Sequence, residues 1–172
     1  MAARDLIAAA AFGLAMAFVG WLLVRDDPML APESAATLPG GKAVFVAIDL
    51  AAQDLVRGAD VYAAQCASCH GVDLEGAPDW RTADADGRFP APPHDATGHT
   101  WHHDDATLYD YVALGGAGAM AKAGVDYDSG MPAYGDILSE AEIRDVLAYI
   151  KSTWPERERA AQAARTVAAS GG

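Results

Sequence analysis

Two cysteines and a histidine, Cys66, Cys69 and His70, are the residues whose types and spacing most directly indicate a chemistry. In the pattern Cys-x-x-Cys-His each thiol can add to one vinyl group of a haem, and the histidine that follows is held close enough to bind the iron. The alternatives are a redox-active cysteine pair or half of a zinc site. A zinc site usually needs four protein ligands, and the chain has no third cysteine. We therefore predict haem c, bound covalently through Cys66 and Cys69.

A methionine in a loop stiffened by proline offers a second bond to the iron. Met131 lies within residues 129–135, where Pro132 fixes the backbone and could hold the thioether toward the metal. Thioether sulfur is a soft, neutral ligand, and Met/His ligation raises the reduction potential of a haem. Met131 could instead only fill the loop, or Met120 could be the ligand. Met120 lies among glycines and alanines, in a segment expected to be floppy, and no proline follows it. We therefore favour Met131.

Helices before and after these residues must position them. Small and apolar residues recur every three or four positions from Asp54 into the cysteine motif, and Gly58 within that pattern predicts a close helix crossing. The partner is expected to be a helix that begins at Ser139, where Ser139 and Glu142 fit a capping box. An apolar stripe follows at helical spacing: Ile143, Val146, Leu147, Ile150 and Trp154. A third helix is expected over about 104–114, where two glycines stop it.

Three separated segments, in this order, resemble a class I, monohaem cytochrome c. They are CASCH at 66–70, TGHTWHHDDATLYDYVALGG at 97–116 and GMPAYGDILSEAEIRDVLAYIKSTWP at 130–155. The resemblance implies an all-α cytochrome c fold around one covalent haem, with the first and last helices crossing near Gly58 and Tyr62. It also implies His70 as the proximal ligand, Met131 as the distal ligand, and one-electron transfer as the activity. With both axial positions filled, we do not expect an enzyme.

An insertion at 77–95 precedes the second of these segments, and a group of histidines runs from the insertion into the segment. The insertion is expected to wrap one haem edge, where Arg81 or Arg88 could offset a propionate or could be solvated loop charges. Four of the five histidines are His94, His99, His102 and His103. Imidazoles suit copper, so a second metal site is one interpretation. The resemblance to a cytochrome c includes the histidines of 97–116 and favours a second interpretation. In that interpretation the histidines belong to the haem-edge loop, and Trp101 packs on the haem or binds a propionate.

The amino-terminal segment 6–24 has 19 residues without a charge, and about 20 apolar residues span a bilayer as a helix. Arg4 precedes the segment and acidic residues follow it, so the positive-inside rule places the amino terminus in the cytoplasm. A cleaved signal peptide is the alternative, but cleavage after the Ala-x-Ala triplet at 15–17 would leave an apolar start. We predict a single-pass anchor in the bacterial cytoplasmic membrane, with the haem domain on the periplasmic side.

The predicted organisation therefore has four parts. Residues 1–25 form the transmembrane anchor, 26–50 a linker rich in proline and glycine, 51–155 the cytochrome c domain, and 156–172 a helical extension with a disordered tail. In the linker, residues 44–50 could form a short strand or a segment packed on the domain. The extension is expected to be helical to about Arg165, with the last six residues disordered.

The charge of the chain is −12, with 12 Lys+Arg against 24 Asp+Glu. This argues against a nucleic-acid partner, which would require clustered cations, and favours a partner with a basic patch. The chain is similar to membrane-anchored carriers that serve terminal oxidases or photosynthetic reaction centres. We predict electron transfer from a quinol:cytochrome c oxidoreductase to one of these. The alternatives are a haem-bearing subunit of a larger redox complex, or a haem enzyme or sensor with an open iron site.

Overall fold

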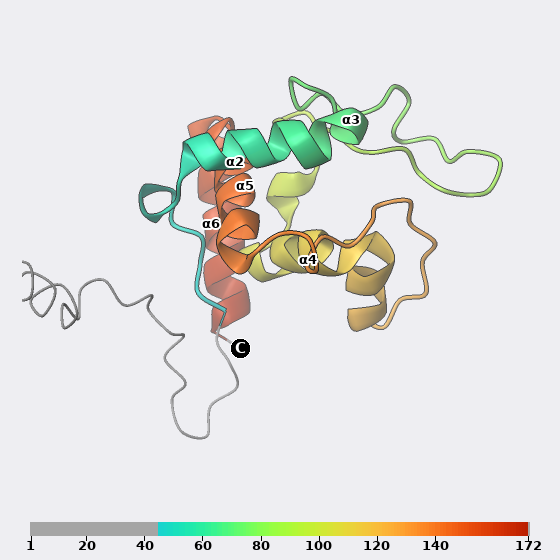
Figure 1. Cartoon of the computed structure of the whole chain (residues 1–172). Helices are drawn as coiled ribbons and strands as arrows, with labels where there is room; N and C mark the ends of the chain where they lie inside the picture. The colour runs from blue at the N-terminus through green and yellow to red at the C-terminus, as the bar shows by residue number, and fades with distance from the viewer. Residues whose placement is uncertain (1–44, 172) are drawn as a thin grey trace, which may run out of the picture. The chain divides into compact units, whose positions relative to one another are not determined.

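The computed structural model describes residues 45–171, and the following description concerns those residues. Their regular structure is helical, without a strand in this range, which confirms the all-α prediction for the part described (Figure 1). The helices α2 (Leu55–Val61), η2 (Tyr62–Cys66) and α3 (Ala67–His70) follow one another directly, and η2 is a turn of π-helix. The elements in chain order are η1 (Leu50–Ala52), α2 (Leu55–Val61), η2 (Tyr62–Cys66), α3 (Ala67–His70), η3 (Thr100–His102), α4 (Asp105–Lys122), α5 (Glu140–Ser152) and α6 (Glu156–Ser170).

The predicted membrane anchor and most of the predicted linker, residues 1–44, lie outside the described range. None of the helices from residue 45 onward is long and apolar enough to cross a membrane. The end of the linker packs on the domain and does not form a strand. The Ile48 N–H donates to Asp105 Oδ2 at 2.8 Å, and the Ile48 carbonyl accepts from Lys151 Nζ at 3.1 Å. Of the two alternatives for this segment, the packed one is therefore confirmed.

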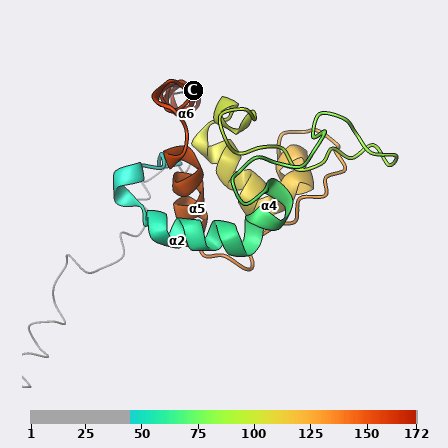
Figure 2. The same ribbon diagram turned by 90° about the horizontal axis from the view of Figure 1, so that it is seen from above.

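The helices α2 and α5 cross closely at Gly58, as predicted (Figures 1 and 2). A Cβ atom on Gly58 would lie 2.7 Å from the backbone carbon of Asp145 and 2.9 Å from Tyr149 Cβ, so no larger residue fits without movement of α5. Asp145 also accepts the backbone N–H of Asp54 at 3.0 Å, at the start of α2, and pairs with Arg57. The crossing is therefore fixed by shape and by charge together.

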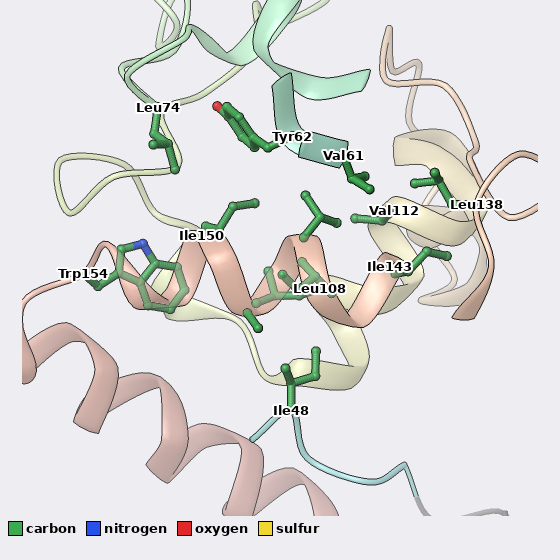
Figure 3. Packing of buried hydrophobic residues seen from close by; sticks show 13 residues of the cluster. Ile48, Val61, Tyr62, Leu74, Leu108, Val112, Leu138, Ile143, Ile150 and Trp154 are labelled. Carbon is green, nitrogen blue, oxygen red and sulfur yellow. The ribbon is translucent and has the colours of Figure 1, made fainter. Parts of the chain in front are cut away.

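The predicted stripe of α5 forms the centre of the core, shown in Figure 3. Its five residues are all buried, and the capping box of Ser139 and Glu142 is present with both hydrogen bonds. Tyr62 reaches the same cluster from η2. The Trp154 indole Nε1–H donates to the His94 carbonyl at 2.7 Å, which connects the end of α5 to the insertion.

Helix α4 kinks at Gly115, whose φ of 72° and ψ of 170° lie outside the helical range. The predicted stop is thus real, but a second helical part continues to Lys122. The expectation that Met120 lies in a floppy segment was therefore wrong. The Tyr111 hydroxyl donates to Met120 Sδ at 3.0 Å, and Lys122 Nζ lies 2.6 Å from the Asp110 carboxylate. These contacts join the two parts of α4 across the kink and order the second part.

Helix α6 runs to Ser170, beyond the predicted end at about Arg165, so residues 167–170 of the expected disordered tail are helical. The reason is a buried polar contact that composition does not reveal. The Gln162 side-chain amide donates to Asp105 Oδ1 at 2.7 Å, and the Thr166 hydroxyl accepts the Asp105 N–H at 3.0 Å. These bonds hold the carboxyl-terminal helix against the start of α4.

Candidate functional site

The two cysteines lie on consecutive turns of the helical segment that begins with α2. Cys66 ends the π-turn η2 and is half-buried, whereas Cys69 lies in α3 and is exposed; neither forms a disulfide. Single π-turns inside helices frequently occur at functional sites. Burial raises the pKa of the Cys66 thiol to about 11, because the apolar surroundings disfavour the thiolate. The structure therefore presents two free thiols at the edge of an apolar region.

His70 is oriented by a backbone carbonyl of the insertion. His70 Nδ1 lies 2.8 Å from the Pro92 carbonyl oxygen. A carbonyl can only accept, so Nδ1 carries the proton and Nε2 keeps its lone pair. The side chain is only 8% exposed, and burial lowers the pKa of His70. A neutral imidazole with one nitrogen fixed by a carbonyl is the form in which histidine binds metals.

The loop that carries Met131 docks on the kink of α4. The non-helical backbone at Gly115 leaves carbonyls at the end of the first part of α4 without helical partners. A Cβ atom on Gly115 would lie 2.8 Å from the Met131 carbonyl oxygen, so the close approach requires glycine. Three backbone hydrogen bonds join the loop to the kink: Tyr134 to Val112 at 3.0 Å, Gly135 to Ala113 at 3.0 Å and Gly116 to Met131 at 3.1 Å.

The same loop is connected to the cysteine motif. The Tyr134 hydroxyl donates to the Gln65 carbonyl at 2.8 Å, one residue before Cys66. Cys66 and Met131 are both half-buried and pack against the same hydrophobic cluster. Ser129 Oγ accepts the Met131 N–H at 3.2 Å and fixes the backbone just before the thioether. The structure thus brings the predicted attachment residue and the predicted distal ligand to one core.

These residues fit a haem attached through thioethers. The donor set comprises two free thiols, a neutral imidazole with its Nε2 available, and a thioether held beside the same apolar cluster. A family model described as Cytochrome c matches residues 55–154, which contain all of these groups. The chain belongs to the cytochrome c family. No curated protein and no solved structure gave a significant match.

Cytochromes c bind haem c covalently and typically carry electrons, and both statements apply to this chain as a member of the family. Cys66 and Cys69 fit the attachment motif. Between residues 45 and 171, no group of three or more histidine, cysteine, aspartate or glutamate side chains is arranged to hold a metal ion. The second metal site is therefore not supported, and the histidines instead take part in a series of ring contacts.

These ring contacts order the insertion of this cytochrome c. The Trp80 ring stacks on His99 with 5.6 Å between centroids, and Arg81 lies over Trp80 at 4.1 Å. His94 stacks on His70 at 3.9 Å. The Trp101 indole Nε1–H donates to the Ala96 carbonyl at 3.3 Å. The insertion is thus ordered by aromatic contacts on one side and by the His70–Pro92 hydrogen bond on the other.

Three groups that support the site were not identified from the sequence. They are the Pro92 carbonyl, the Tyr134 hydroxyl and the kink at Gly115 as a docking place for the methionine loop. The proline run of the insertion was a signal for Pro92, because a chain restricted by prolines can present one carbonyl in a fixed direction. For Tyr134 no sequence signal identified the partner, which lies 69 positions away.

Proposed function

We propose that this cytochrome c is a one-electron carrier with a single haem, attached through Cys66 and Cys69 and ligated by His70 and Met131. The observation that carries the proposal is the hydrogen bond from His70 Nδ1 to Pro92, because it leaves Nε2 as the free nitrogen. The methionine loop supports the opposite ligand, because its docking on α4 and on the cysteine motif fixes Met131 beside the same core.

When bound, haem c supplies the redox centre, and the chain's own residues set its properties. Pro92 holds the imidazole of His70 in one tautomer and one orientation. A neutral thioether from Met131 favours the ferrous state relative to a second imidazole and raises the reduction potential. The apolar cluster that Cys66 packs against would lower the polarity around the group, which would favour the ferrous state further because that state carries less charge. With His70 and Met131 both bound to it, the group would have no position left for a substrate and would be suited to electron transfer.

We further propose that the protein is tethered to the periplasmic face of the bacterial cytoplasmic membrane by residues 6–24. There it would carry electrons from a quinol:cytochrome c oxidoreductase to a terminal oxidase or a reaction centre. Seven of the lysines and arginines in residues 45–171 pair with carboxylates of the chain itself. The exposed Asp73 and Glu75 after the cysteine motif pair with none of the lysines and arginines that the structure describes. A partner with basic residues at its docking site fits this surface.

Spectroscopy of the full-length holoprotein tests the ligands. Made in a host competent for cytochrome maturation, the polypeptide should gain the mass of one haem. The ferric protein should show the weak far-red charge-transfer band of a methionine–iron bond. Met131→Ala should abolish that band and lower the reduction potential, whereas the matched variant Met120→Ala should retain both. Loss of the band in Met120→Ala alone, or rapid binding of carbon monoxide by the unmodified ferrous protein, would contradict the proposed ligation.

A separate measurement tests the tether. The full-length protein should remain in the membrane fraction after an alkaline carbonate wash, and a variant that lacks residues 1–25 should be released. Release of the full-length protein would contradict the anchor without affecting the ligands. Purification in mild detergent distinguishes the carrier from a fixed subunit, because a subunit would stay with other chains at constant stoichiometry.

A further inference from the structure

The insertion at 77–95 contacts both His70 and the segment that precedes Met131. At its base, the Ala77 N–H donates to the Ala91 carbonyl at 2.8 Å, which closes the insertion into a loop. The next residue, Pro92, accepts the hydrogen bond from His70. The base of the loop is therefore fixed to the proximal side.

The far part of the loop is a tight turn that presents Arg88. The Arg88 N–H and the Asp86 N–H both donate to Asp84 Oδ1 at 2.9 Å, and the Asp84 N–H donates to the Arg88 carbonyl at 2.8 Å. Gly87, with a φ of 84°, allows the chain to reverse there. Pro90 and Pro92 stiffen the short segment that leads from Arg88 back to the base. The position of the Arg88 backbone is thus defined by the turn.

From this turn, Arg88 contacts the segment that leads to Met131. Arg88 Nε lies 2.8 Å from Asp128 Oδ2, across 40 positions of sequence. The residue after Asp128 is Ser129, whose hydroxyl accepts the Met131 N–H. Figures 1 and 2 both show the insertion and the segment after α4 at the same end of the domain. One loop therefore contains the residue that orients His70 and contacts the segment that precedes Met131.

We propose that Arg88 and Asp128 are positioning residues for the distal ligand. Their ion pair fastens the Met131 loop to the insertion, so that one loop supports both sides of the haem. The inference rests on the proposed ligation by His70 and Met131 and adds to it the groups that keep Met131 in place. When the pair breaks, the segment 123–130 gains freedom, and Met131 leaves the iron more often.

The expected effect is modest, because the pair lies on the surface. The side chains of Arg88 and Asp128 are 49% and 64% exposed, and exposed pairs couple weakly. We expect a change of about two- to fivefold in the frequency of methionine dissociation. Salt should reproduce part of this change, because exposed charges are screened at a Debye length of about 10 Å in 0.1 M salt.

The test measures how fast imidazole displaces methionine in the ferric holoprotein, followed through the far-red band at low and at high salt. Arg88→Gln and Asp128→Asn should each accelerate displacement at low salt and should remove most of its salt dependence. The double variant should be no faster than either single one. The matched control is Glu156→Gln, which removes a surface ion pair with Arg159 on α6 and should leave the rate unchanged.

The reduction potential separates positioning from simple electrostatics. If the two residues acted only through their charges, loss of the cation and loss of the anion would shift the reduction potential in opposite directions. The two variants would then not change the rate of methionine displacement in the same direction. The charge-reversed pair, Arg88→Asp with Asp128→Arg, should restore slow displacement.

Three outcomes would overturn the inference. Unchanged rates of methionine displacement in both single variants would overturn it. In that case a far-red band in the unmodified protein would still support the proposed ligation. Opposite changes of rate in the two variants would overturn it in the same way. Absence of the band from the unmodified protein would overturn the ligation, and the inference with it.

Discussion

Replacement of Gly115 by alanine tests whether the kink of α4 holds the distal side of the site. The backbone at Gly115 has φ 72° and ψ 170°, a region that is essentially restricted to glycine. An added Cβ atom would also lie 2.8 Å from three atoms of the methionine loop: the Met131 oxygen, the Pro132 carbon and the Ala133 nitrogen. Because all three are backbone atoms, no side chain can rotate away to make room.

The magnitude follows from these two effects. A residue other than glycine in this region costs about 1–3 kcal/mol of strain, and overpacking against fixed atoms costs about 1–3 kcal/mol. The reduced freedom of the unfolded chain offsets about 0.4–1 kcal/mol. These ranges combine to a net loss of about 1–6 kcal/mol, taken mainly from the docking of the methionine loop.

The assay combines urea unfolding of the ferric holoprotein with the intensity of the far-red band before any urea is added. Gly115→Ala should weaken or abolish the band and lower the unfolding midpoint. The matched control is Gly124→Ala, because Gly124 has a φ of 80° but no atom within 4 Å of the added Cβ. It should lower the midpoint by strain alone and keep the band. If Gly115→Ala keeps the band and matches the control in stability, docking on the kink does not position Met131.

Two further predictions concern Tyr134 and His103. Tyr134→Phe removes the hydrogen bond to Gln65, so the free energy of unfolding of the holoprotein should fall by about 1 kcal/mol. Imidazole should also displace the methionine faster. If the free energy of unfolding and the rate of displacement are both unchanged, this bond has no such role. Burial, with a smaller effect of the charge on His99, lowers the pKa of His103 below its ordinary value of 6.5. The unfolded chain therefore takes up the proton first, so this contribution to stability is complete above pH 6.5 and falls as pH drops toward the folded pKa. Between pH 7.5 and pH 5.5, the urea midpoint of His103→Gln should fall less than that of the unmodified protein, and an equal fall would contradict the prediction.

The parts of the fold that the sequence predicted are those determined by neighbouring residues. The capping box joins Ser139 to a residue three positions away, and the stripe of α5 repeats with the helical period. The break at Gly115 was predicted for the same reason, since two consecutive glycines interrupt a helix locally. Gly58 was predicted at a crossing because a glycine inside a regular helix pattern is unfavourable without a packing reason.

What could not be predicted depends on residues far apart in the sequence. Nothing near Asp105 indicates that its carboxylate will bind Ile48, Lys151 and Gln162 together, and without that contact the end of α6 was expected to be disordered. The composition of the last residues, rich in alanine and ending in two glycines, gives no sign of a buried polar face. For the same reason Met120 was judged by its glycine-rich neighbours, although Tyr111, nine positions earlier, orders it.

The two proposed iron ligands are held by forces of different strength, and this difference bears on function. His70 follows two cysteines that would be covalently attached to the haem, and it lies at the end of a helical segment packed on α5. Met131 is only partly buried against the core and is otherwise held by hydrogen bonds to a kinked helix, by Tyr134 and by a loop that makes a surface ion pair. Regions with few buried apolar contacts open first in a folded protein. The distal side should therefore open at a lower free energy than the whole domain unfolds. On this basis, the contacts of the methionine loop, more than the cysteine motif, decide whether the site is a closed carrier or an open haem that binds ligands.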